Sequence, residues 1–252
     1  MDRKSCDEEP NNRNFRIAFS QDVFTVAPNL TVGLIALPSV NNLDNNVEVN
    51  ALLKHMELEI IESGIEKGLI SELETISAWR HVYSQFGVKP ARYHCAAEAL
   101  IRRVVEHGSL PRIHTLVNLC NALSLKARIP IASCDINGVE ELVVQKATGL
   151  EPYLPIGKPD NPEFPDAGEI IYTDHLGRAH SRRWNWRQSD IVKTTEQSST
   201  MLFTIEAVHQ EAKVLVEATT NLLFELLQPF AVGVDSQRGF INADSPVYEF
   251  TI

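Results

Sequence analysis

The sequence predicts a single α+β domain in which mixed or antiparallel sheets pack against helices. Three observations favour this class. Short segments with two-residue alternation lie near residues 15–37 and 130–190, and segments with helical periodicity lie between them and after them. Strands and helices do not alternate regularly, as they would in a doubly wound sheet. No low-complexity linker divides the 252 residues into separate units.

The N-terminal part is expected to hold a tail and the first strands. Residues 1–14 are polar and charged without periodicity, so we expect them to be disordered. From Phe15 the chain runs apolar in short lengths that are interrupted at Pro28 and Asn29. This pattern predicts a strand, a turn and a second strand that ends near Pro38.

Helices are expected from residue 47 onward because apolar residues recur there at spacings of three and four. The segments with this spacing are 47–68, 71–87, 93–108 and 113–126. Ser71 followed by Glu74 has the pattern of a capping box, and Gly108 has the position of a C-terminal cap. Glu98 and Arg102 are one turn apart, on the side opposite the apolar stripe, a spacing more typical of a solvated ion pair than of a catalytic dyad.

Strands are expected again after Pro130, where the periodicity changes to two. The expected strands are 130–136, 141–148, 168–174 and 179–189. Five prolines in residues 150–168 predict a long ordered loop between the second and third of them. Gly177 suits a hairpin turn, and a final helix is expected over residues 205–227. We therefore expect the domain to span 15–230, with 231–252 packed on it as a C-terminal extension.

Composition and motifs exclude several function classes. A formal net charge of −10 argues against non-specific coating of nucleic acid, although basic residues cluster locally in the middle of the chain. No apolar run is long enough to span a membrane, so a cytoplasmic protein is expected. The scattered cysteines predict neither a zinc site nor a disulfide framework. Nucleotide-binding and hydrolase motifs are absent as well, and we expect no metal and no cofactor.

The segment RRWNWRQS, residues 182–189, concentrates arginine and tryptophan. If it were one strand, Arg183, Asn185 and Arg187 would face one side, and Trp184 and Trp186 would face the other. One interpretation is a strand whose indoles cover a sheet and whose polar row is solvated. The other is a recognition wall, with arginines for a phosphate or carboxylate and indoles for stacking on a ring. The pattern alone favours the first interpretation.

Many segments in one order nevertheless resemble a known family. They include FSQDVFTVAPNLTVGLI, AWRHVYSQFGVKPARYHCAAEALIRRV, LPRIHTLVNLCNALSLKARIPIASCDI and GEIIYTDHLGRAHSRRWNWRQS. Together they resemble the tRNA-editing B3/B4 domain of the bacterial phenylalanyl-tRNA synthetase beta subunit and, above all, its free-standing relatives. The resemblance implies binding of the acceptor end of aminoacyl-tRNA and hydrolysis of a mischarged aminoacyl ester after its release from the synthetase.

The resemblance also implies candidate site residues for such an aminoacyl-tRNA deacylase. The candidates to orient a water molecule are Asn118, Asn121, Glu169 and Gln188. The candidates for substrate binding are Glu98, Arg102, Arg103, Ser133, Asp135, Arg183, Trp184, Asn185, Trp186 and Arg187. An aminoacyl ester is already activated, so positioning water and stabilising the oxyanion are the main requirements.

The chain departs from the synthetase pattern at two places. Ala132 stands where the synthetase has a histidine, and the WNWRQS segment stands where the synthetase has a glycine-rich segment with a glutamate. Two other functions therefore remain open. One is a non-catalytic tRNA-binding module, and the other is an amino-acid-binding protein or small-molecule enzyme that reuses the pocket.

Overall fold

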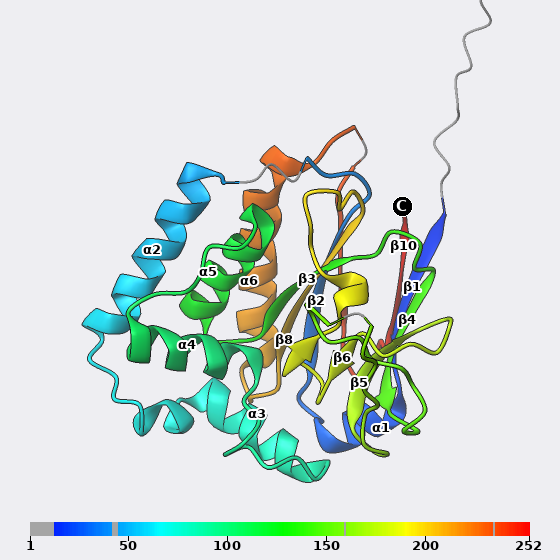
Figure 1. Cartoon of the computed structure of the whole chain (residues 1–252), viewed down its shortest axis with the longest axis horizontal. Coiled ribbons are helices and arrows are strands. Elements are labelled where there is room, and N and C mark those ends of the chain that lie inside the picture. Colours follow the sequence, from blue (N-terminus) through cyan, green and yellow to red (C-terminus); the bar gives the residue numbers. More distant parts are fainter. Residues whose placement is uncertain (1–12, 42–44, 159, 234) are drawn as a thin grey trace, which may run out of the picture.

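The computed structural model describes residues 13–41, 45–158, 160–233 and 235–252. Most of the expected disordered tail lies outside these ranges. Its last residues are not tail-like, because the backbone N–H of Arg13 donates to the carbonyl of Ile252 at 2.7 Å and Asn14 begins a strand. Helices, one sheet and a second sheet form successive layers across the molecule (Figure 1). The fold is therefore α+β, as predicted.

The first sheet has the strand order β10-β1-β4-β5 and is mixed, because β1 and β4 run parallel while the other neighbours run antiparallel. Its strands are β10 (Val247–Thr251), β1 (Asn14–Phe19), β4 (Glu141–Lys146) and β5 (Ile170–Asp174). The second sheet is antiparallel, with the order β3-β8-β2-β9. It contains β3 (Ile131–Asp135), β8 (Met201–Ala207), β2 (Thr31–Leu37) and β9 (Gln237–Ile241). Residues 231–252 thus supply one strand to each sheet.

Helices cover the second sheet on the side away from the first sheet (Figure 1). This layer contains α5 (Thr115–Ala127) and α6 (Ala212–Leu227), with α2 (Val47–Glu62) packed against α5. The remaining helices are α1 (Gln21–Val26), α3 (Glu74–Gln85) and α4 (Ala96–His107), and short 3-10 helices span Leu69–Glu72, Asp190–Val192 and Gln228–Phe230. No helix of the described ranges has the length and apolar character that crossing a membrane requires.

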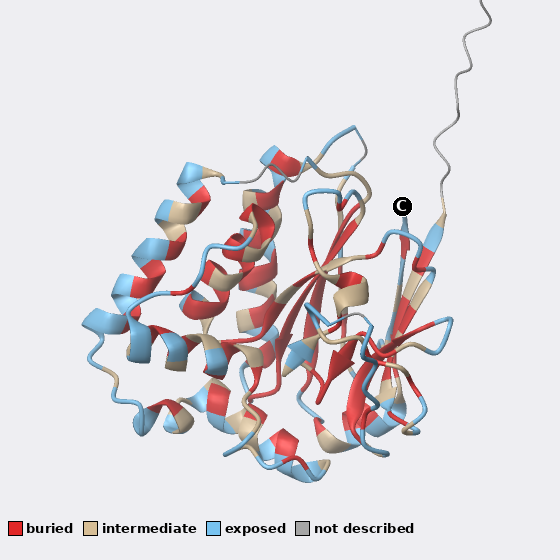
Figure 2. Cartoon of the chain, viewed as in Figure 1, coloured by how far each residue is buried: buried red, intermediate tan, exposed pale blue. Residues whose placement is uncertain are grey.

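The second sheet separates two cores, so its central strands are buried on both faces (Figure 2). Val32 and Leu34 of β2 belong to the core between the sheets, whereas Ile35 and Leu37 belong to the core beneath α5 and α6. Strand β8 is buried along its whole length for the same reason. Consequently, any polar side chain on the inner face of β8 lies deep inside the protein.

The structure corrects four expectations at the level of elements. The first strand is shorter than expected and ends at Phe19, because a short helix, α1, follows it before the turn at Pro28 and Asn29. Ser71 lies in a 3-10 helix, so Leu73 takes the cap position of α3. The expected final helix begins only at Ala212, because residues 201–207 pair with both β2 and β3 as a strand.

The largest correction concerns residues 179–189. They do not form one strand, and the two alternating faces expected for them are absent. Instead, β6 (Ser181–Arg182) and β7 (Arg187–Gln188) form a two-stranded ribbon around a four-residue turn. Arg183 and Trp184 within the turn have φ angles of 46° and 64°, in the left-handed region that reverses the chain.

Candidate functional site

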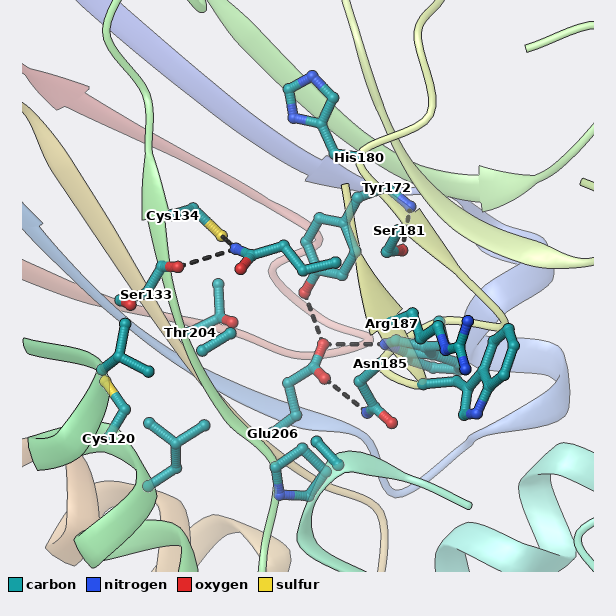
Figure 3. Close-up of a pocket in the computed structure, with 18 of the residues that line it drawn as sticks. Cys120, Ser133, Cys134, Tyr172, His180, Ser181, Asn185, Arg187, Thr204 and Glu206 are labelled. Atoms are coloured by element: carbon teal, nitrogen blue, oxygen red, sulfur yellow. Dashed lines mark hydrogen bonds between the residues drawn. The ribbon is translucent and has the colours of Figure 1, made fainter. Parts of the chain in front are cut away.

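A cavity of about 210 Å³ opens between the two sheets and the start of α5. Its walls come from α5 (Val117, Cys120 and Asn121), from β3 (residues 131–134) and from the turn between β6 and β7 (residues 184–188). Tyr172 of β5 and Thr204 and Glu206 of β8 add polar groups to the lining, and Figure 3 shows these side chains converging. The remaining lining residues are Ala96, Pro130, His180 and Ser181. Most of the wall is apolar, so the few polar groups define its chemistry.

Glu206 is the buried carboxylate of this cavity and is only 2% exposed. Its Oε1 accepts hydrogen bonds from the Tyr172 hydroxyl at 2.6 Å and from Trp184 Nε1 at 2.9 Å, and its Oε2 accepts one from Asn185 Nδ2 at 2.8 Å. Burial raises the pKa of Glu206 and outweighs these three hydrogen bonds, which lower it. The cavity therefore contains a buried carboxylate that three hydrogen-bond donors orient. None of these three donors carries a positive charge.

Helix α3 supports this network from behind. The Tyr83 hydroxyl donates to Asn185 Oδ1 at 2.8 Å, which leaves the Nδ2 end of the amide to donate to Glu206. Trp79 packs edge-on against Trp184 with ring centroids 5.0 Å apart, and Phe86 lies 6.4 Å from the same ring. Trp184 is thus a core residue as well as a cavity residue.

The turn that presents these side chains is held by Glu169. This buried carboxylate binds the Arg182 guanidinium through both oxygens, at 2.8 and 3.2 Å, and accepts the backbone N–H of Arg183 at 2.5 Å. The backbone N–H of Trp184 donates to the carbonyl of Ile170. These bonds fix two consecutive left-handed residues, a conformation that a bulky side chain adopts at a cost of about 1–3 kcal/mol.

Aromatic rings and guanidinium groups stack at the mouth of the cavity. The Arg183 guanidinium lies 3.8 Å from the centroid of the Tyr93 ring, and the Arg187 guanidinium lies 4.3 Å from the centroid of the Trp186 ring. Tyr93 and Trp186 meet edge to face at 4.9 Å. Arg187 is exposed, and Trp186 is half-buried. This rim combines a flat stacking surface with positive charge.

The thiols in the cavity are poor nucleophiles. Burial raises the pKa of the Cys134 thiol to about 12 and raises that of Cys120 further still, so both stay protonated at neutral pH. Ser133 Oγ is hydrogen-bonded to Thr194 Oγ1 at 2.8 Å rather than to a base. No cluster of three metal-binding side chains occurs in the described part of the chain. The geometry suits chemistry by a bound water molecule.

The structure brings part of the expected site together. The expected residues that line the cavity are Asn121, Ser133, Trp184, Asn185, Trp186, Arg187 and Gln188. Gln188 uses its Nε2 for the carbonyl of Ser133 at 2.8 Å and for Cys134 Sγ at 3.2 Å, so its amide oxygen is the end that remains for a ligand. Arg183 lies at the rim through its contact with Tyr93.

The other expected residues lie outside the cavity lining. Asn118 bridges Asn50 and the backbone N–H of Ile113, and Glu169 holds the turn, as described above. Asp135 caps the turn that follows β3 through the backbone N–H of Asn137. Arg103 is exposed on α4.

Glu98 and Arg102 do not form the solvated pair that their spacing favours. Glu98 is fully buried, and its Oε1 accepts hydrogen bonds from both Arg102 and Arg80 at 2.8 Å. The spacing of Glu98 and Arg102 within one helix could not predict this arrangement, because Arg80 comes from α3. The cluster therefore ties α3 to α4 and stands apart from the cavity lining.

Glu206 is the acidic cavity residue that sequence reasoning missed. The segment MLFTIEA alternates between apolar Phe203 and Ile205 and polar Thr204 and Glu206, which is a strand signal. Assigning residue 205 to a helix hid this signal.

Comparisons with known proteins identify the family. A family model described as B3/4 domain matches residues 78–237, a range that includes most of the cavity wall. The chain belongs to the B3/4 domain family. The match contains most of α3 and all of α4, α5, the ribbon and β8, so the B3/4 domain supplies the buried carboxylate, the turn and the stacking rim.

Comparison with solved structures adds a distant neighbour. The chain is similar to an N-terminal fragment of the phenylalanyl-tRNA synthetase beta subunit from Pyrococcus horikoshii, with 9% sequence identity and a TM-score of 0.46. The similarity covers 96% of this chain and 55% of that fragment. No curated protein matches the chain.

Proposed function

We propose that the protein binds the aminoacylated acceptor end of tRNA at this cavity and hydrolyses a mischarged aminoacyl ester. The observation that carries the proposal is the combination, in one B3/4 domain, of a mainly apolar cavity that holds the buried Glu206 carboxylate with a rim that stacks and carries positive charge. The cavity suits the aminoacyl group, and the rim suits the terminal nucleotide and its phosphate. Membership of the B3/4 family and the segment-by-segment resemblance to the synthetase editing domain support this assignment.

Specific roles follow from position. Trp186 is proposed to stack on the terminal adenine, while Arg183 and Arg187 contact phosphate or the substrate carbonyl. Asn121 and Gln188 present amide groups to the cavity and are proposed to orient water. Arg103, exposed on α4, is proposed to contact phosphate further along the acceptor stem.

A deacylation screen tests the proposal. The protein is incubated with a panel of mischarged aminoacyl-tRNAs, and release of the amino acid is measured against the spontaneous rate. We expect at least one substrate to be hydrolysed faster, and we expect Arg187→Ala to slow that reaction. If every tRNA in the panel decays at its spontaneous rate, the hydrolase assignment is wrong.

A non-catalytic tRNA-binding module is the second candidate, and Ala132 is the observation that favours it. Ala132 lines the cavity where the synthetase pattern has a histidine. Salt-dependent binding of charged tRNA without turnover would identify this function instead.

A further inference from the structure

We infer that Glu206 is the general base of the proposed hydrolysis and that Tyr83 is a positioning residue which acts on Glu206 through Asn185. This inference rests on the proposed function. It concerns residues that neither the family match nor the sequence motif assigns. It follows from three features of the cavity: its acidic group, the open acceptor position on that group, and the amide that orients it.

Glu206 is the acidic residue among the described residues that line the cavity. A carboxylate oxygen accepts about two hydrogen bonds, so the two bonds to Oε1 use its capacity while Oε2 has one position left. Because the residue lines the cavity, that position is available to a water molecule placed against the ester carbonyl. Figure 3 shows the carboxylate at the centre of the converging polar groups.

The proposed step is balanced in atoms and electrons. Glu206 Oε2 takes a proton from water as the water oxygen bonds to the ester carbonyl carbon, forming a tetrahedral oxyanion. The ester C–O bond then breaks. The ribose oxygen of the terminal adenosine leaves with the electron pair and takes the proton back from Glu206. The products are the free amino acid and tRNA with a free ribose hydroxyl.

The orientation of Asn185 is what keeps Glu206 in place for this step. An amide can present either its oxygen or its nitrogen, and a carboxylate requires the nitrogen. The Tyr83 hydroxyl donates to Asn185 Oδ1 and so fixes the correct orientation. Tyr83 is buried on α3 and is not part of the cavity lining, so its effect passes through the amide.

Several other ionisable groups lie near Glu206 and bear on the pH dependence of the reaction. Tyr172 of β5, Tyr83 of α3 and Cys134 of β3 face it, and burial raises the pKa of each, so they stay neutral through the acid and neutral range. Arg187 lies at the mouth of the cavity. His180 also lines the cavity, and its Nε2 lies 2.9 Å from Asp174 Oδ2. Glu206, whose pKa is raised by burial, is therefore expected to set the acid limb of the rate.

The test measures single-turnover deacylation as a function of pH on the substrate found in the screen. Glu206→Gln should lower the rate by about 100-fold or more, because general-base catalysis contributes about that much. Tyr83→Phe should lower the rate at neutral pH and move the acid limb to higher pH, since the amide donor to the ionised carboxylate is no longer fixed. Tyr248→Phe, which removes a hydroxyl bonded to the Arg238 carbonyl on β9, is the matched control and should leave the profile unchanged.

Each outcome decides a separate claim. Wild-type inactivity on all substrates overturns the proposed function and the base assignment together. If the wild type is active and Glu206→Gln is equally active, only the base assignment is overturned. The base assignment is also overturned if Glu206→Gln keeps its hydrolytic rate but acts on a different aminoacyl group, since the residue then sets specificity. If Glu206→Gln loses its near-ultraviolet dichroism from tryptophan, Tyr83→Phe decides instead, because an acid limb that does not move in this variant overturns the base assignment.

Discussion

At the scale of single residues, the cavity is organised by one buried charge, and that charge affects stability as well as chemistry. Burial raises the pKa of Glu206 above its value in the unfolded chain. The folded protein therefore holds this proton more readily than the unfolded chain. The corresponding contribution to stability is fully present below the unfolded pKa and is lost as the pH rises through the folded pKa.

Glu206→Gln removes this pH dependence. We expect the melting temperature of the variant, relative to wild type, to be higher at about pH 8 than at about pH 5, because the wild type loses the stabilising contribution of the raised pKa as the pH rises. Thermal unfolding at both pH values measures the difference. An offset that is identical at the two pH values would show that Glu206 has the same protonation state throughout.

At the scale of elements, the turn between β6 and β7 depends on Glu169 behind it. Glu169→Gln leaves the buried Arg182 without its full counter-charge, so we expect a loss of about 3 kcal/mol in the free energy of unfolding. Glu163→Gln is the matched control, because Glu163 contacts the same guanidinium at 3.2 Å but is 56% exposed. Its loss should stay below about 1 kcal/mol. Equal losses in urea denaturation would contradict the role of burial.

Gly33 of β2 marks the closest approach of the second sheet to α6. A Cβ at this position would lie 1.9 Å from Thr220 Oγ1 and 3.1 Å from a methyl group of Val216. Gly33→Ala should therefore destabilise the protein by about 1–3 kcal/mol, and adding Thr220→Ala should recover part of the loss. Gly68→Ala, which meets no atom within 4 Å, is the control for urea denaturation. A double variant no better than Gly33→Ala would show that the contact with Thr220 is not the cause.

Elements that depend on local periodicity were predictable, and those that depend on distant partners were not. Helix α4 follows from its apolar stripe and Gly108; it ends where expected and begins at Ala96, three residues after the start of the expected segment. The RRWNWRQS segment gave the wrong structure because alternation cannot reveal a turn that Glu169 and Ile170 hold from another strand. Likewise, β8 is a strand because it pairs on both sides with strands that lie far from it in the sequence.

The same limit applies to the site. Trp186, Arg187 and Gln188 were identified through the family resemblance, because the pattern of their segment alone favoured a solvated strand. Glu206 has no distinctive neighbours in the sequence. Its importance comes from Tyr172, Trp184 and Asn185, which reach it only in the folded chain.

At the scale of the whole molecule, a net charge of −10 opposes binding to nucleic acid, so the cationic rim has to act locally. We expect Arg187→Ala to weaken tRNA binding and to reduce the slope of log affinity against log salt concentration by about 1. Arg238→Ala is the matched control, because its guanidinium stacks on Phe224 of α6, away from the cavity residues. Fluorescence titrations at several salt concentrations measure both slopes. An equal change in both variants would indicate non-specific attraction.

In the turn between β6 and β7, the residues that hold the backbone differ from the residues that face the cavity mouth, and this affects how such a protein can evolve. Arg182, Glu169 and Trp184 hold the loop from its rear, inside the core, whereas Trp186 and Arg187 project from its front. Substitution of Trp186 or Arg187 therefore changes which ligand groups the mouth of the cavity can contact, without removing the contacts that hold the turn. Related proteins can therefore acquire new ligands through a few substitutions at these two positions while the buried residues of the turn stay the same. A laboratory library that varies only Trp186 and Arg187 explores the same set of changes.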